Sequence, residues 1–528
     1  MLHVEELTAE CGPGTPGVAV LVLRGGVEGF RLIRGMANVE AGAPISIHTA
    51  FDAGSIAKTV TGLCVAMLED AGELSPAASI RDSLPELPAY ASSITLENLL
   101  RHESGLHSYF ALLYYMAGWH PRKPPTSQQV LETLCRAPGP KWAPGSRYEY
   151  TDTNYFLLAR AVERIAGIPF GALAQEMLFQ PLGMTDSFMT DAGTRADAKL
   201  AKGYAPYPIE LRSPHAFRTA WDEGHYPVGH RYQHTGAEGF RTSIADIAAL
   251  AGEILAPSLI DPKTMARATA PSRIRPGGLG YGYGLNTGTY LGLSFQGHDG
   301  RIQGFTASLS VFPEHALAIT CLTNREDLGA WTCRNLILKD LLGAEPRREP
   351  SRLRASGPSP EPRPGFYLDP TTSSYLELTL HDGRPHAAVN GEGPKPIDYE
   401  ARSPSGATPG AGAIDVHQGS EIQTFVPFVE SKHEPRADSC AGKYVCEALR
   451  TTFHVDVTAA GLRLTNADPA RPSMDLEYTP TIRGFFRSLD PYPGVSQLEF
   501  LRRGERVVAF RYRDYDGDGR EAFVFRRA

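Results

Sequence analysis

The chain contains few cysteines, and none of them has the spacing of a metal or redox motif. Its seven cysteines are scattered through 528 residues, and no two form a Cys-x-x-Cys sequence. Disulfide frameworks are typical of short secreted chains with an even set of cysteines. We therefore expect free thiols and a reducing, cytoplasmic compartment. Cys64 lies within an apolar helical run and is predicted to be a small core residue.

Long hydrophobic runs and basic clusters are also absent. No apolar stretch approaches the roughly 18 residues needed to span a bilayer, and the N-terminus carries Glu5 and Glu6 where a secretory signal would carry Lys or Arg. The net charge is -7, and the Arg-rich stretch at residues 347–354 is interrupted by proline and glutamate. We therefore expect neither a membrane nor a nucleic-acid partner.

What the sequence does contain is a change of pattern near residue 343. Compact cores stop growing at roughly 250–300 residues, so a chain of this length is expected to divide. Within residues 1–343, strand-like runs at both ends enclose helical segments, which predicts an α+β domain whose ends share one antiparallel sheet. Residues 344–365 have the composition of a linker. Short alternating runs then predict two small all-β modules, at 366–433 and 434–528.

A serine and a lysine stand three residues apart at the start of the helix predicted for residues 55–70. Positions i and i+3 share one helix face, so the ammonium of Lys58 can reach the hydroxyl of Ser55. A serine hydroxyl becomes a good nucleophile only when a base takes its proton, and a helix N-terminus favours developing negative charge. The pair predicts a nucleophile with its base, and the alternative is an N-cap serine with a solvated lysine.

Two further motifs follow in chain order. Residues 148–155 read YEYTDTNY, and residues 297–300 read GHDG just before a predicted strand. Together with the serine–lysine pair they resemble the serine β-lactamase and DD-peptidase superfamily, which carries SxxK, then Tyr-x-Asn, then Lys-Thr-Gly or His-x-Gly on an edge strand. Residues 99–106 and 239–246 resemble two more segments of that family. The chain is most similar to bacterial D-aminopeptidases, whose catalytic domain precedes two antiparallel, lipocalin-like β-barrels.

The resemblance implies a role for each matching residue. Ser55 would attack the carbonyl and become acylated, with Lys58 as its base or proton relay. Tyr150 would pass a proton toward the leaving group, and His298 would hydrogen-bond to Tyr150. The backbone N–H of Arg301 would join that of Ser55 as the second donor to the oxyanion.

Three other residues are candidates for substrate contact. Gly300 would let a substrate backbone lie along the strand, and Asp299 stands beside it. Tyr109 belongs to a group of aromatic residues at helical spacing that could form an apolar wall of the substrate cleft, with core packing as the alternative: Tyr109, Phe110, Tyr114 and Tyr115.

One position departs from the family pattern, because Asp152 stands where the motif has asparagine. An ionised carboxylate only accepts hydrogen bonds. Beside Lys58 it would favour the charged ammonium, weaken the lysine as a base and shift the proton transfer to Tyr150. It could also bind a substrate ammonium, and the simpler alternative is that it only orients Lys58.

No motif predicts a metal or a cofactor. His225, His230 and His234 have no acidic partner at helical spacing, and we expect ordinary or substrate-lining histidines. Residues 514–519 look like the start of a calcium loop, but Phe525 stands at the twelfth position, where such a loop requires glutamate. They predict a hairpin turn instead. Residues 483–494, aromatic and stiffened by proline, are a candidate loop for narrowing the substrate cleft.

We therefore expect a serine hydrolase that forms an acyl-enzyme on Ser55 and cleaves amide or ester bonds. The leading candidate is a D-aminopeptidase or a D-stereospecific amidase or esterase. An acyltransferase or peptide cyclase on the same scaffold is the alternative, and a non-catalytic binding protein is a remote one. The expected partner is a small molecule or short peptide, and a homodimer is conceivable.

Overall fold

A computed structural model describes most of the chain. Up to residue 343 the exceptions are 111, 114–124, 138, 191–199, 206–225, 229–233 and 274–277. Beyond it the described residues are 353–357, 364–368, 375–381, 384–389, 395–401, 414–418, 421–427, 437–447, 451–458, 461–467, 476–482, 485–488, 496–503, 506–514 and 522–528. The chain splits into two compact units, and the second of them takes up the chain from Arg347 on.

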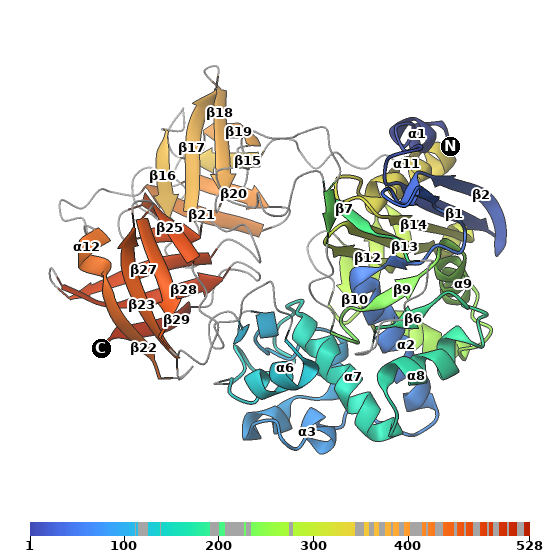
Figure 1. Cartoon of the computed structure of the whole chain (residues 1–528), viewed down its shortest axis with the longest axis horizontal. Helices are drawn as coiled ribbons and strands as arrows, with labels where there is room; N and C mark the ends of the chain where they lie inside the picture. The colour runs from blue at the N-terminus through green and yellow to red at the C-terminus, as the bar shows by residue number, and fades with distance from the viewer. Residues whose placement is uncertain are drawn as a thin grey trace. The chain divides into compact units, whose positions relative to one another are not determined.

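Seven strands of the first unit form one antiparallel sheet (Figure 1). Their order is β10 (Leu279–Tyr281), β11 (Asn286–Tyr290), β12 (Leu293–Ile302), β13 (Phe305–Phe312), β14 (Leu317–Thr323), β1 (Val18–Arg24) and β2 (Val27–Arg34). β1 pairs antiparallel with β14, so that Val18 lies opposite Thr323. The prediction that both ends of this region share one sheet is therefore confirmed.

Helices cover both faces of the sheet, which explains why β1 is apolar at successive positions. Val18, Val20 and Val22 share one core with buried residues of α11 (Ala330–Leu342), and Val4 of α1 (Leu2–Leu7) joins it. α9 (Ile244–Leu255) lies on the opposite face, where a Cβ at Gly252 would be 3.6 Å from Leu23. Because successive strand residues point to opposite faces, a strand covered on both sides needs apolar residues throughout.

The helix that carries the serine–lysine pair approaches the sheet closely. α2 (Ala57–Asp70) follows a single 3₁₀ turn at Gly54–Ile56, so Ser55 lies in that turn and the α-helix begins two residues later than predicted. A Cβ at Gly62 would lie only 2.2 Å from the carbonyl oxygen of Tyr283, between β10 and β11. Glycine at this position therefore lets α2 pack against the sheet.

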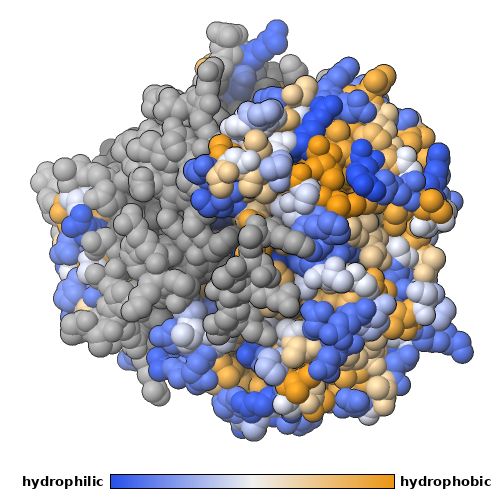
Figure 2. Space-filling model, turned by 45° about the vertical axis from the view of Figure 1, so that its right-hand side comes forward, coloured by the Kyte–Doolittle hydropathy of each residue, from blue (hydrophilic) through white to orange (hydrophobic). Residues whose placement is uncertain are grey.

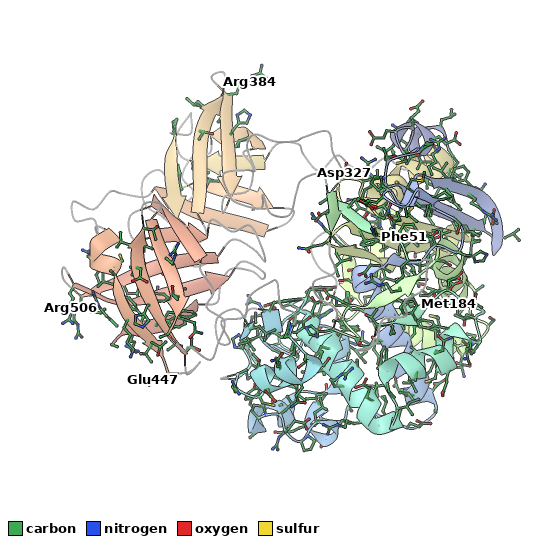
Figure 3. The ribbon with its side chains drawn as sticks, viewed as in Figure 1. Phe51, Met184, Asp327, Arg384, Glu447 and Arg506 are labelled. Atoms are coloured by element: carbon green, nitrogen blue, oxygen red, sulfur yellow. The ribbon has the colours of Figure 1, made fainter. Side chains whose placement is uncertain are left out.

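Apart from α7 (Asp152–Ala166), the remaining elements of the first unit are short. The other helices are α3 (Ile80–Ser83), α4 (Leu96–Leu100), α6 (Ser127–Leu134), α8 (Phe170–Ala174) and α10 (Pro262–Thr269). The strands are β3 (Met36–Asn38), β4 (Ala43–Pro44), β5 (Phe51–Asp52), β6 (Phe188–Met189), β7 (Gly203–Ala205), β8 (Tyr226–Val228) and β9 (Phe240–Thr242). Phe51, labelled in Figure 3, is fully buried where β5 pairs with β9.

The second unit contains two sheets that each close on themselves. The first runs in the order β15 (Leu353–Gly357), β19 (Lys395–Ala401), β18 (Arg384–Val389), β17 (Tyr375–His381), β16 (Gly365–Leu368), β21 (Glu421–Pro427) and β20 (Ile414–Gln418). The second runs in chain order, after α12 (Ala437–Cys440): β22 (Gly442–Cys446), β23 (Thr451–Thr458), β24 (Gly461–Asn466), β25 (Leu476–Ile482), β26 (Phe485–Ser488), β27 (Ser496–Arg503), β28 (Arg506–Asp514) and β29 (Ala522–Arg527). The likeness to lipocalins and the boundary near residue 433 stay predictions.

Two predictions for this unit are wrong in part. The predicted linker contains β15, which pairs parallel with β19 and antiparallel with β20, so the first module is not wholly antiparallel. The predicted cleft loop contains β26, which pairs with β25 and β27, and its residues 489–494 lie outside the described residues. Both segments gain order from strand pairing that short, weakly alternating runs do not reveal. The turn predicted at residues 514–519 lies, beyond Asp514, outside the described residues, while the flanking strands β28 and β29 pair antiparallel.

On the side seen in Figure 2, hydrophilic and hydrophobic residues are intermixed over the surface of the first unit. Among the helices that the structure describes, none combines the length and the apolar character needed to cross a membrane.

Candidate active site

The turn that carries Ser55 is fixed by a buried ion pair on one side. Asp52 of β5 accepts a hydrogen bond from the backbone N–H of Gly54 at 3.0 Å and pairs with Arg241 of β9. Gly54 has a φ of 51°, a conformation that a side chain would strain. The turn therefore presents Ser55, which is partly exposed, from a rigid base.

Strand β12 holds the turn on the other side, at Gly300. A Cβ at Gly300 would lie 2.0 Å from the carbonyl oxygen of Ala53, so the absent side chain makes room for the serine turn. A substrate backbone along the strand at Gly300 stays a prediction. A Cβ at Gly54 would in turn lie 3.0 Å from the backbone nitrogen of Arg301. The backbone of Arg301 therefore passes beside the serine turn, where a second oxyanion donor is expected.

The predicted edge strand is an edge along only half of its length. β12 pairs with β11 as far as Gly297, and with β13 from Gln296 to Ile302. Among the described strands, residues 298–302 therefore pair on one side only. This free half faces the turn of Ser55, which places His298 and Gly300 beside the serine.

Lys58 is the centre of the site. Its ammonium donates to Ser55 Oγ at 3.1 Å and to the carbonyl oxygen of Ala237 at 2.8 Å, and it lies 2.5 Å from Asp152 Oδ1. The centroid of the Tyr150 ring lies 4.9 Å from the ammonium nitrogen. Burial by itself would lower the pKa of Lys58, but the carboxylate of Asp152 and the phenol of Tyr150 outweigh it, so the pKa is raised. Lys58 is therefore charged.

Tyr150 lies just before α7, with its phenol close to both Lys58 and Ser55. Burial raises the pKa of its phenol, Lys58 opposes that rise, and Asp152 adds to it, with a net increase. The phenol therefore keeps its proton at neutral pH.

His298 lies in the site but has a different partner from the one predicted. Its Nδ1 is 2.6 Å from the carbonyl oxygen of Asp299, which can only accept, so Nδ1 carries the proton. Its Nε2 therefore accepts from the hydroxyl of Tyr281 at 2.9 Å. The ring centroids of His298 and Tyr150 are 6.1 Å apart. Burial, followed by the charge of Lys58, lowers the pKa of His298 to about 4, so the imidazole is neutral.

Two predicted substrate contacts point elsewhere. The carboxylate of Asp299 binds Arg334 of α11 at 2.8 and 3.0 Å, on the opposite face of β12 from His298, as the alternation of strand side chains requires. Tyr109 is fully buried and packs with Phe156 and His234, at centroid distances of 5.9 and 5.1 Å. Core packing therefore describes Tyr109 better than a cleft wall. Tyr114 and Tyr115 lie outside the described residues.

Sequence reasoning missed the group that positions the tyrosine motif. His102, buried and with a φ of 56°, accepts at Nδ1 from the amide of Asn154 at 2.9 Å and from the N–H of Thr151 at 3.3 Å. Ser104 donates to Asn154 Oδ1 at 2.6 Å. His102 and Ser104 belong to the segment 99–106 that resembled the family. The sequence therefore pointed to this segment, but not to its role in holding the tyrosine motif. The backbone strain at His102 is supported by these bonds.

The histidines considered for a metal do not form a described cluster. His225 and His230 lie outside the described residues, and no group of three potential ligands occurs among the residues that the structure covers. His234 is 2% exposed, and burial, more than any charge, lowers its pKa to about 4.

The order and geometry of these residues agree with a comparison of the whole sequence with protein families. The model described as Beta-lactamase matches residues 4–340. The chain belongs to the beta-lactamase family.

Relatives and solved structures extend the family likeness to particular proteins. A D-aminopeptidase of Cereibacter sphaeroides is 26% identical over 517 residues, covering 95% of this chain and 93% of the relative. Esterase EstB of Burkholderia gladioli is 29% identical over 293 residues, covering 51% of this chain and 74% of its own. The octameric penicillin-binding protein homologue from Pyrococcus abyssi superposes with a TM-score of 0.56 at 18% identity, covering 99% of this chain and 98% of that one, which shows a shared fold.

Proposed function

We propose that the protein is a serine hydrolase that forms an acyl-enzyme on Ser55, with a D-aminopeptidase-like preference for amide or ester substrates of small size. The observation that carries the proposal is the contact of Lys58 with Ser55 Oγ at 3.1 Å, with the phenol of Tyr150 close to both groups. The D-aminopeptidase relative supports the substrate class because it matches nearly the whole chain.

The proton path must start from a charged lysine. An ammonium cannot take the serine proton unless it gives one away, and Asp152 lies 2.5 Å from it. As Ser55 Oγ bonds to the substrate carbonyl carbon, its proton passes to Lys58, and Lys58 passes another proton to Asp152. Aspartate in place of the motif asparagine thus supplies the proton acceptor that a protonated Lys58 needs.

The leaving group requires a donor, and Tyr150 supplies it. Its phenol keeps its proton, which it transfers to the departing nitrogen or oxygen as the carbonyl re-forms. Lys58 then restores that proton and recovers its own from Asp152. Water attacks the acyl-enzyme by the reverse path. The backbone N–H groups of Ser55 and Arg301 bind the carbonyl oxygen as negative charge develops on it.

Mass spectrometry after reaction with a fluorophosphonate probe tests the proposal. We expect one adduct, on Ser55, and none in Ser55→Ala, whose circular dichroism should be unchanged because a single atom is lost. Turnover of D- and L-aminoacyl amides with and without an added amine then separates hydrolysis from acyl transfer. Labelling of Ser55→Ala at the native rate would refute the assignment of Ser55 as the nucleophile.

A further inference from the structure

A turn at residues 234–239 brings an additional carboxylate beside the lysine. Thr61 of α2 donates to the carbonyl oxygen of Gly236 at 2.8 Å, and Lys58 donates to that of Ala237 at 2.8 Å. A Cβ at Gly236 would lie 2.4 Å from Ala159 of α7, so the turn is wedged between two helices. Because the ammonium that contacts Ala237 also contacts Ser55 Oγ, the next residue, Glu238, lies close to the nucleophile.

The charges around Glu238 are matched without it. Lys58 pairs with Asp152, and Arg241 pairs with Asp52. All four of these charges act on Glu238. Each of the two cations thus has a carboxylate partner other than Glu238.

Glu238 has no cation of its own among the residues that the structure describes. Its Oε2 is buried and has no hydrogen-bond partner there, although the residue as a whole is partly exposed. Burial, followed by the repulsion of Asp152, raises its pKa well above the usual range. His234, at the start of the same turn, has two buried ring nitrogens without partners in the described part of the chain, and its imidazole is neutral. A buried polar group left in this state is costly unless a ligand completes it.

We propose that Glu238 is a specificity-determining residue that binds a primary ammonium group on the substrate, next to the scissile carbonyl. The inference rests on the proposed acyl-enzyme at Ser55. Lys58 contacts both the nucleophile and this turn. A substrate whose carbonyl carbon lies at Ser55 can therefore reach Glu238 with an amino group that is close to that carbonyl. The ammonium supplies the positive charge that Glu238 lacks, and makes the third ion pair of the site. Substrates whose amine is acylated lack that pair.

A neutral Glu238 that donates a hydrogen bond to the substrate is the rival explanation. Glu238→Gln distinguishes the two, because an amide can still donate but carries no negative charge. Glu314→Gln is the matched control, since Glu314 is an exposed carboxylate in the short 3₁₀ turn before β14.

Protection of Ser55 from a fluorophosphonate probe measures the recognition without requiring turnover. The protecting ligands are the D- and L-forms of alaninamide and phenylalaninamide, each compared with the corresponding amide that lacks the amino group. In the native protein and in Glu314→Gln, we compare the enantiomer of each amino amide that protects more strongly with its deamino analogue. We expect that enantiomer to protect at the lower concentration. In Glu238→Gln the advantage of the amine should fall roughly 10- to 100-fold, the effect of losing a hydrogen bond to a charged group.

The outcomes separate this inference from the function on which it rests. Equal protection by amine and deamino ligands in the native protein overturns the role of Glu238 while labelling of Ser55 continues. An unchanged advantage in Glu238→Gln overturns the ion pair and favours the neutral donor. Failure of the probe to label Ser55 at all would refute the proposed function itself.

Discussion

Lys58 Nζ lies 2.5 Å from Asp152 Oδ1, and the lysine side chain is fully buried. Asparagine at position 152 could offer this lysine a neutral oxygen, whereas aspartate offers it a full negative charge. Burial lowers the pKa of Lys58, and the carboxylate of Asp152 more than offsets that effect. Burial raises the pKa of Tyr150, and Asp152 adds to that rise while Lys58 opposes it. One substitution in the motif therefore acts on the pKa of two groups at the nucleophile.

Replacing Asp152 with asparagine should move the pH dependence of acylation. The strongest influence that raises the pKa of Lys58 is removed while burial remains, so the pKa of Lys58 falls and its neutral form becomes accessible. We expect the variant to be slow at neutral pH, without its final proton acceptor, and to recover as pH rises and Lys58 loses its proton. Pre-steady-state acylation against pH measures this. Glu149→Gln, in the same motif, is the control, and a variant faster than the native protein at neutral pH would mean that Asp152 only restrains Lys58.

Replacing Tyr150 with phenylalanine should slow acylation by amides by roughly 10²–10⁴, the usual contribution of general acid–base groups. The reason is that an amine departs only with a proton, which the neutral phenol supplies. An ester with a p-nitrophenolate leaving group needs no such proton and should be affected much less. Tyr148→Phe serves as the matched control. Equal losses on amide and activated ester would assign Tyr150 to positioning and not to proton donation.

Replacing Gly300 with alanine should displace the serine turn. The new Cβ would lie 2.0 Å from the carbonyl oxygen of Ala53, and backbone cannot move aside as a flexible side chain can. We expect a loss of roughly 1–3 kcal/mol in the free energy of unfolding, typical of overpacking, together with slower labelling of Ser55. Gly29→Ala in β2 is the control, because its Cβ would meet nothing nearer than 3.8 Å. Native labelling rates in Gly300→Ala would show that the turn is not held by β12.

The stability of the first unit should fall in mild acid because of two buried histidines. Burial lowers the pKa of His234 and of His298 to about 4 from an ordinary 6.5. Between those pH values the unfolded chain binds protons that the folded chain does not, so each contribution is full above about pH 6.5 and is lost as pH falls toward 4. Each amounts to roughly 3 kcal/mol. Denaturant unfolding of His234→Gln should therefore show a shallower pH slope than the native protein, and that of His315→Gln, at an exposed site, the native slope.

Local sequence patterns predicted those features of the structure that depend on local backbone geometry. The three-residue spacing of Ser55 and Lys58 places them on one helix face wherever the helix lies, and apolar runs fix β1 and β14 as covered strands. The order of the motifs indicated the family, because motif residues and their spacing can be recognised along the chain without knowledge of the fold. Even so, the helix began at Ala57, since the 3₁₀ turn of Ser55 depends on contacts with Asp52 and β12.

The partners of the site residues were decided by the tertiary structure alone. Asp299 looked like a substrate contact by its place beside His298, but the two side chains leave β12 on opposite faces, and Arg334 of α11 occupies one of them. Glu238 carried no signal in the sequence, because its environment is assembled from α2, α7 and β9. Which groups meet in a buried site depends on long-range packing, and neither spacing nor periodicity within one segment contains that information.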